Sequence, residues 1–268
     1  MRKLLLSLLA VSSTASFAVA NNNEFQEFDN QVSIGWGQNS TEASYGTAAG
    51  APGNVNSVGN MLTLEGERLF NNGVWVDVVA NGQFGAGPSS APGFKGGVVN
   101  PSFTPYSAPS YGLNGKVGYA FPLLNQHLLL TPYALVGINN NSSTAINEII
   151  SSAGVVANNG TANTANQFYY SGGFGGRLEY RINHWIELYA DQNAVYNWDQ
   201  TGMPLGIQPQ NFISYTSTLG GKFNLAPNFQ LGVKGFYTAY DNQAGNFGGA
   251  FAQNTSGFGG IVSVGVTY

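Results

Sequence analysis

The sequence has few charged residues and no cysteine. Asp, Glu, Lys and Arg make up 8% of its 268 residues, whereas soluble domains average about 25%. The absence of cysteine excludes disulfides, a lipoprotein anchor, thiol catalysis and thiolate metal sites. The net charge of -4 is small and provides no basic surface, so we expect no nucleic-acid partner.

Long hydrophobic runs are missing beyond the first residues of the chain. Residues 4–11 are apolar, they follow Arg2 and Lys3, and the small-residue site Ala18-Val19-Ala20 comes after them. This order predicts a secretory signal peptide over residues 1–20 and a single mature domain over 21–268. No later segment approaches the roughly 20 apolar residues that a membrane helix needs, so any passage through a membrane must use strands.

The C-terminal segment has the alternation of a two-faced strand. Its apolar or small positions lie two residues apart, at Phe258, Gly260, Val262, Val264, Val266 and Tyr268. A soluble edge strand can alternate in the same way. Together with its terminal aromatic residue, however, the pattern resembles the last strand of bacterial outer-membrane barrels. That resemblance implies that Tyr268 is the assembly signal read by the barrel-assembly machinery.

The same alternation recurs in four predicted hairpins. Their turns are expected at Asn71-Asn72-Gly73, Pro122–Gln126, Ile182-Asn183 and Ala226-Pro227. One further strand carries Val32, Ile34 and Trp36 on one face. With the C-terminal strand, the pattern predicts about ten strands, an even number that leaves both termini on the same side. The number would be eight if one hairpin lay outside the membrane.

The predicted turns are short, whereas the connections between hairpins are long and rich in Gly, Ser, Asn, Thr and Pro. These connections are 38–57, 87–108, 139–165, 199–210 and 241–256. Short periplasmic turns and long extracellular loops are typical of outer-membrane barrels. The predicted fold class is therefore all-β, a closed antiparallel transmembrane β-barrel.

Charged residues of the predicted strands fall on the face opposite to the apolar residues. We expect ten of them to line the lumen: Glu65, Glu67, Asp77, Lys116, Arg177, Glu179, Glu187, Asp191, Lys222 and Lys234. A charge facing lipid at mid-bilayer would cost about 2–4 kcal/mol. Such a lumen is either an ion-paired plug or a polar conduit that filters small solutes. Ten strands do not decide between them, because barrels of about eight strands are filled by side chains and larger ones leave a channel.

Enzyme hypotheses find little support in the residues. Ten-stranded barrels include surface proteases of the omptin family, which need paired aspartates and an Asp/His pair near the extracellular rim. Here the only histidines, His127 and His184, fall at periplasmic turns. Barrel lipases and deacylases need Ser and His close together, and no serine lies two positions from either histidine. No metal-ligand spacing or nucleotide motif is present, so we expect no enzymatic activity, metal or cofactor.

The signal sequence, the terminal aromatic strand and the small size together resemble the superfamily of small Gram-negative outer-membrane barrels, which includes opacity-type and porin-like proteins. The resemblance implies outer-membrane lipid, lipopolysaccharide and the barrel-assembly machinery as partners. The first functional hypothesis is a narrow passive conduit for small solutes or an envelope-structural barrel. The alternative is a surface adhesin or receptor that binds host ligands through its loops. Segment 87–108, with Phe94, Phe103 and Tyr106, is the leading candidate loop. A hydrolase is the third hypothesis.

Cell fractionation tests the predicted location. Strands with an apolar outer face require lipid or detergent, so the processed chain should sediment with outer membranes and dissolve only when detergent is added. Immunoblotting of the fractions measures this. Recovery of the processed chain in the detergent-free periplasmic extract would contradict the prediction.

Overall fold

The computed structural model describes residues 23–47, 53–87, 110–124, 127–150, 156–199, 211–241, 246–247 and 250–268. The predicted signal peptide, 1–20, lies outside these residues. So do 88–108 and 200–210, which form nearly all of two predicted loops.

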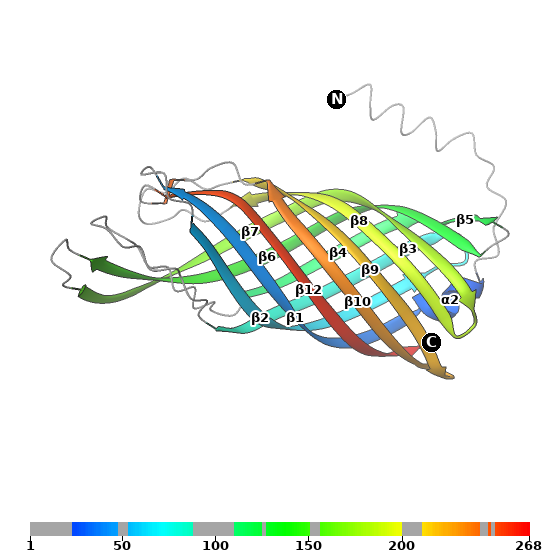
Figure 1. Ribbon diagram of the computed structural model, residues 1–268. Coiled ribbons are helices and arrows are strands. Elements are labelled where there is room, and N and C mark those ends of the chain that lie inside the picture. The colour runs from blue at the N-terminus through cyan, green and yellow to red at the C-terminus, as the bar shows by residue number, and fades with distance from the viewer. Residues whose placement is uncertain are drawn as a thin grey trace, which may run out of the picture.

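The strands form a closed antiparallel barrel (Figure 1). Of its twelve strands, β5 (Phe121–Leu123) and β11 (Asn246–Phe247) are short pieces, paired with β6 and β12. The other ten form the wall: β1 (Gln31–Thr47), β2 (Gly53–Leu69), β3 (Val74–Gly87), β4 (Ser110–Tyr119), β6 (Leu128–Ile150), β7 (Val156–Asn183), β8 (Ile186–Asp199), β9 (Phe212–Ala226), β10 (Phe229–Asp241) and β12 (Ala250–Thr267). The predicted fold class and strand number are confirmed.

The barrel closes where the first and last wall strands pair. β1 and β12 run antiparallel, with Ile34 opposite Val264 and Gln31 opposite Thr267. Just beyond this pairing, the backbone N–H of Tyr268 donates to the carbonyl oxygen of Asn30 at 3.0 Å. Closure pairs the two edge strands of the described sheet with each other, as a lipid environment requires.

The two ends of the barrel differ. One end, which we call the turn end, carries the short connections between strands, the C-terminus and the helix α2 (Asn23–Asp29) (Figure 1). Three of its turns contain a residue with positive φ: Gly73 (85°), Asn228 (64°) and Leu124 (47°). Glycine and asparagine adopt such angles readily. The turn expected at Ile182-Asn183 lies two residues later, at His184-Trp185. We call the opposite end the loop end.

Several strands continue further towards the loop end than the sequence predicted. β1 and β2 pair as far as Tyr45 opposite Gly53, and β6 and β7 pair as far as Ile150 opposite Val156. The prediction of loops over 38–57 and 139–165 was therefore wrong in extent. These polar segments lack the apolar alternation used to find strands, but ladder hydrogen bonds do not depend on an apolar face.

The wall has an apolar outer face and a mixed inner face. On β12, Val262, Val264 and Val266 are exposed on the outside, whereas Ile261, which precedes Val262, is buried inside. Phe174 and Leu219, near the middle of β7 and β9, are 75% and 70% exposed. Large apolar side chains exposed to this degree fit a surface that lies in lipid rather than in water.

The helix α2 was not predicted. Phe25 and Phe28 are 1% and 0% exposed, because the helix lies in the turn end of the barrel. Phe25 belongs to a buried apolar cluster with Leu69, Trp75 and Leu129 from the wall. A seven-residue helix is marginal alone, so this packing must hold it. The described part of the chain contains no helix long and apolar enough to cross a membrane.

Leu219 offers a test of the outward face, because it is the central residue of β9 and exposed. Leu219→Arg should lower the free energy of unfolding by about 2–4 kcal/mol through burial of a charge in lipid. Urea unfolding in phospholipid vesicles measures the change. Leu219→Ala is the control, which should cost much less. Equal losses in the two variants would show that Leu219 does not face lipid.

Candidate functional site

The interior of the barrel has two layers. The deep layer lies at the turn end and is buried, and the basin is a cavity of about 390 Å³ on its loop-end side. The structure places all ten predicted lumen residues inside the barrel. Six belong to the deep layer: Glu67, Asp77, Arg177, Glu179, Glu187 and Lys222. Four lie at the floor of the basin: Glu65, Lys116, Asp191 and Lys234.

Glu67 is the centre of the deep layer. Its Oε1 atom lies 3.0 Å from the Nη1 atom of Arg177 and accepts a hydrogen bond from Nε1 of Trp75 at 2.8 Å. Its Oε2 atom lies 2.8 Å from Nζ of Lys222 and accepts from Nε2 of Gln31 at 3.1 Å. These partners come from β7, β3, β9 and β1. One carboxylate therefore connects strands that lie on different sides of the barrel.

Lys222 connects the helix to the wall. Its Nζ atom lies 2.5 Å from Oδ1 of Asp29 in α2, 2.8 Å from Glu67 and 3.5 Å from Oε1 of Glu187. Gln230 adds a hydrogen bond from Nε2 to the carbonyl oxygen of Phe28 at 3.3 Å. Through these contacts the C-terminal end of α2 is fixed inside the barrel.

The N-terminal part of α2 is attached as well. Glu24 forms an ion pair with Arg181 of β7 at 2.8 Å, and Nε2 of Gln26 donates to Oδ1 of Asn71 at 2.7 Å. Both bonds lie at the turn end, where they are half-buried or exposed. The helix is thus held to the wall on opposite sides of its buried face.

Asp29 is a lumen residue that the sequence analysis missed. Burial raises the pKa of its carboxyl group above the ordinary value, and the charge of Lys222 opposes that rise. A signal was present in the sequence. Phe25, Phe28 and Asp29 are spaced three and four residues apart, which places them on one face of a helix.

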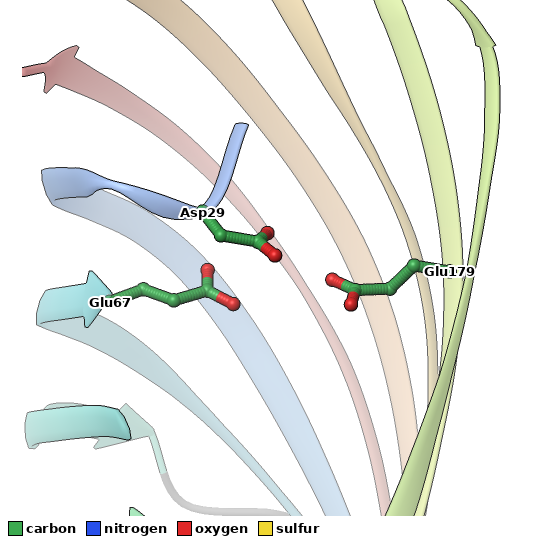
Figure 2. Close-up of side chains that lie close together, drawn as sticks. All are labelled: Asp29, Glu67 and Glu179. Carbon is green, nitrogen blue, oxygen red and sulfur yellow. The ribbon is translucent and has the colours of Figure 1, made fainter. Parts of the chain in front are cut away.

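The carboxylates of Asp29, Glu67 and Glu179 converge from three elements (Figure 2). One oxygen atom of each lies within 4.8 Å of the others, an arrangement that carboxylate-binding metal ions use. Lys222 already contacts Asp29 and Glu67, and Nε of Arg177 lies 2.7 Å from Oε1 of Glu179. The chain therefore supplies its own cations at this point, and the geometry is that of an internal ion-pair network.

Acids outnumber bases in the part of the deep layer next to α2. Four carboxylates (Asp29, Glu67, Glu179 and Glu187) share two bases, Arg177 and Lys222. The Glu187 carboxylate is fully buried and accepts no hydrogen bond from the residues that the structure describes. Removal of either base would leave several buried acids without compensation, which is costly in a medium of low dielectric constant.

The floor of the basin consists of ion pairs, of which Lys234–Glu65 and Lys116–Asp191 join strands that are not adjacent in the wall, whereas Lys116–Asp77 joins two neighbouring strands. Lys234 lies 2.7 Å from Glu65, and Lys116 lies 3.2 Å from Asp77 and 3.4 Å from Asp191. These residues are well separated in the sequence and come from β10, β2, β4, β3 and β8. Each charged group of the floor therefore has a partner of opposite charge, with Lys116 shared by two acids.

Neutral polar side chains form the wall above the floor. Asn139 donates from Nδ2 to Oγ of Ser171 at 3.0 Å, and that hydroxyl donates to Oδ1 of Asn197 at 2.7 Å. Asn197 continues the chain with a bond from Nδ2 to Oγ of Ser214 at 3.1 Å. The chain crosses four adjacent strands, β6 to β9, and gives this side of the basin an ordered row of amides and hydroxyls.

Two tyrosine rings inside the barrel explain why glycine occupies two inward-facing positions of the wall. A Cβ atom at Gly175 would overlap the ring of Tyr133, and one at Gly220 would overlap the ring of Tyr189. The absent side chains of these glycines make space for rings, and the Tyr189 ring in turn lies 4.3 Å from the guanidinium carbon of Arg177.

Neither histidine of the chain lies in the lumen. His127 and His184 are exposed residues of turns at the turn end. The ring of His184 contacts that of Trp185, with centroids 4.7 Å apart. No histidine is therefore available to act on a molecule held in the basin.

Solved structures share the fold of this chain, although sequence comparisons identify no relative. No protein-family model matches the chain, and no curated protein sequence is similar to it. The outer-membrane protease OmpT from Escherichia coli has a similar structure, with a TM-score of 0.58 and 12% identity over 96% of this chain and 99% of that chain. The chain therefore has the fold of a small outer-membrane β-barrel.

Other outer-membrane barrels superpose less well. An outer-membrane channel from Pseudomonas putida F1 has a TM-score of 0.42 at 8% identity, with coverage of 90% of this chain and 96% of that chain. Neisserial surface protein A has a TM-score of 0.34 at 11% identity, with coverage of 88% of this chain and 97% of that chain. Identities this low describe a fold and leave activity to be argued from the site.

Lys222→Met should destabilise the barrel, because it leaves Asp29, Glu67 and Glu187 without their shared cation. Breaking a buried ion pair from one side costs about 3–5 kcal/mol. Urea unfolding in phospholipid vesicles measures the loss. The control is Arg68→Met at an exposed outer position, where Arg68 lies over the Phe70 ring and the loss should be about 1 kcal/mol or less. Similar losses in both variants would contradict the network.

Proposed function

We propose that the protein is an integral outer-membrane barrel that is closed to diffusion at its turn end and serves as a structural element of the envelope. Helix α2 carries this proposal, since it lies inside the turn end with Phe28 and Asp29 fully buried. Short turns of such barrels face the periplasm, so the closed end would face the periplasm and the basin would face outward.

The deep layer supports closure rather than conduction. Glu67, Glu179 and Glu187 are 0–1% exposed, so within the described part of the chain solvent does not reach these carboxylates. A solute that passed this layer would have to separate Lys222 from Asp29 and Glu67. Because each of these charges is buried, separation is costly. The plug hypothesis is therefore favoured over the passive conduit.

Export and assembly belong to the same proposal. The apolar outer face supports contact with membrane lipid and lipopolysaccharide. Tyr268 supports recognition by the barrel-assembly machinery, because it follows the last strand and is 64% exposed. Catalysis is not part of the proposal, since neither His127 nor His184 reaches the lumen.

Planar-bilayer recording tests closure. The mature barrel should remain closed at all moderate voltages, whereas deletion of residues 23–29 should produce discrete conductance steps because the plug is absent. Glu27→Ala is the matched control, since Glu27 is an exposed residue of α2 and its loss leaves the plug in place. Steady conductance by the unmodified barrel would refute closure.

A surface receptor is the second candidate function. The predicted loop 87–108 lies outside the described residues, apart from Gly87 at the end of β3. The basin favours this candidate instead, because it is a polar cavity on the loop-end side of the barrel. The closed turn end and a binding basin are compatible, since the first prevents passage and the second requires only access from outside.

A further inference from the structure

We propose that the basin binds a neutral saccharide of one or two sugar rings. The inference extends the receptor role and does not require the barrel to be closed. It rests on three properties of the basin: an aromatic wall, an amide wall opposite to it, and a floor whose charges are already paired.

The aromatic wall consists of three rings that line the basin two residues nearer the loop end than Ser171 and Ser214, just beyond the row of amides and hydroxyls on the same side. Tyr169 of β7 and Phe212 of β9 lie edge to face with centroids 5.3 Å apart, and Phe212 and Tyr240 of β10 follow at 5.9 Å. Sugar rings present a C–H face that packs against apolar surface, and aromatic side chains offer a large, rigid surface for such contact. The three rings together provide this surface on one side of the cavity.

The amide wall lies across the lumen. Gln83 of β3 accepts a hydrogen bond from Nδ2 of Asn39 of β1 at 3.2 Å, and both residues line the basin with Asn81 and Asn114. β3 and β9 are five strands apart in a ring of ten, so these amides face the rings. Oδ1 of Asn39 is buried and accepts no hydrogen bond from the described residues.

Amides suit hydroxyl groups in particular. Each Asn or Gln side chain carries both donors and an acceptor, and a sugar hydroxyl is likewise a donor and an acceptor. A ligand with several hydroxyls could therefore satisfy several amides at once, including the free acceptor of Asn39. The facing walls match the two faces of a sugar ring, one apolar and one polar.

The ion pairs of the floor disfavour the binding of a charged ligand. Lys234 is paired with Glu65, and Lys116 is shared by Asp77 and Asp191. An anionic or cationic ligand would have to compete with these pairs for its counter-charge. A neutral ligand leaves them intact. The volume of about 390 Å³ lies at the lower end of the range of about 300–1,000 Å³ for small-molecule pockets, which fits a short saccharide.

Isothermal titration calorimetry on the full mature barrel in phospholipid nanodiscs tests the proposal. Nanodiscs are needed because alkyl-glycoside detergents carry sugar headgroups that would compete. The neutral probes are glucose, N-acetylglucosamine, maltose and N,N′-diacetylchitobiose, and the charged probes are glucuronate and glucosamine. At least one neutral probe should bind saturably, about tenfold or more tighter than either charged probe.

Variants locate the binding. Phe212→Ala and Asn39→Ala should each weaken binding of that probe by about fivefold or more, through loss of ring contact or of a hydrogen bond. Tyr215→Ala is the matched control, because Tyr215 is an outward aromatic residue of the same strand as Phe212, and affinity should not change. Heat-modifiable migration in gels confirms that each variant is folded, and a misfolded alanine variant is replaced by Phe212→Leu or Asn39→Ser.

Three results would overturn the proposal: no saturable binding of any neutral probe, tighter binding of a charged probe, or unchanged affinity in the folded basin variants. The result is separable from the closure test. A conducting barrel that still binds maltose would refute closure alone, and a closed barrel that binds none of the neutral probes would refute the saccharide site alone.

Discussion

A charged side chain in the middle of a barrel strand can lie only inside the barrel, because the lipid-facing position costs about 2–4 kcal/mol. Inside, it is removed from water and must meet an opposite charge. Lys222, Arg177 and Lys234 each meet an opposite charge across the lumen, and Lys222 and Arg177 also contact acids on the adjacent or the same strand. Because charged side chains must face inward and pair there, they connect opposite sides of the wall and fill the lumen at the turn end.

Much of this arrangement follows from local sequence. The period of two in a strand fixes the face of each residue, so Glu65 and Glu67 must oppose Leu62 and Leu64 once the strand exists. Turn chemistry sets the ends, as at Asn71-Asn72-Gly73, where the glycine has a φ of 85°. Both rules act over a few residues, which is why the strand number and the inward position of the ten charged residues could be anticipated.

What could not be anticipated depends on long-range geometry. Lys222 and Glu67 are 155 residues apart, and alternation gives the face of a residue but not its height along the lumen. The convergence of Tyr169, Phe212 and Tyr240 has the same origin. Helix α2 was missed for another reason: a seven-residue helix has little intrinsic stability, and its stability comes from a cavity that exists only after the barrel has closed.

Asn30 joins α2 to β1 and is bonded in two further directions. Its carbonyl oxygen accepts from the N–H of Tyr268 at 3.0 Å, and its Oδ1 atom accepts from the N–H of Leu69 at 2.9 Å. Asn30 thus links helix α2, strand β1 and Tyr268. Docking of the last strand therefore does more than seal the wall, because it adds one further attachment, from Tyr268 to Asn30, at the end of the helix that fills the barrel.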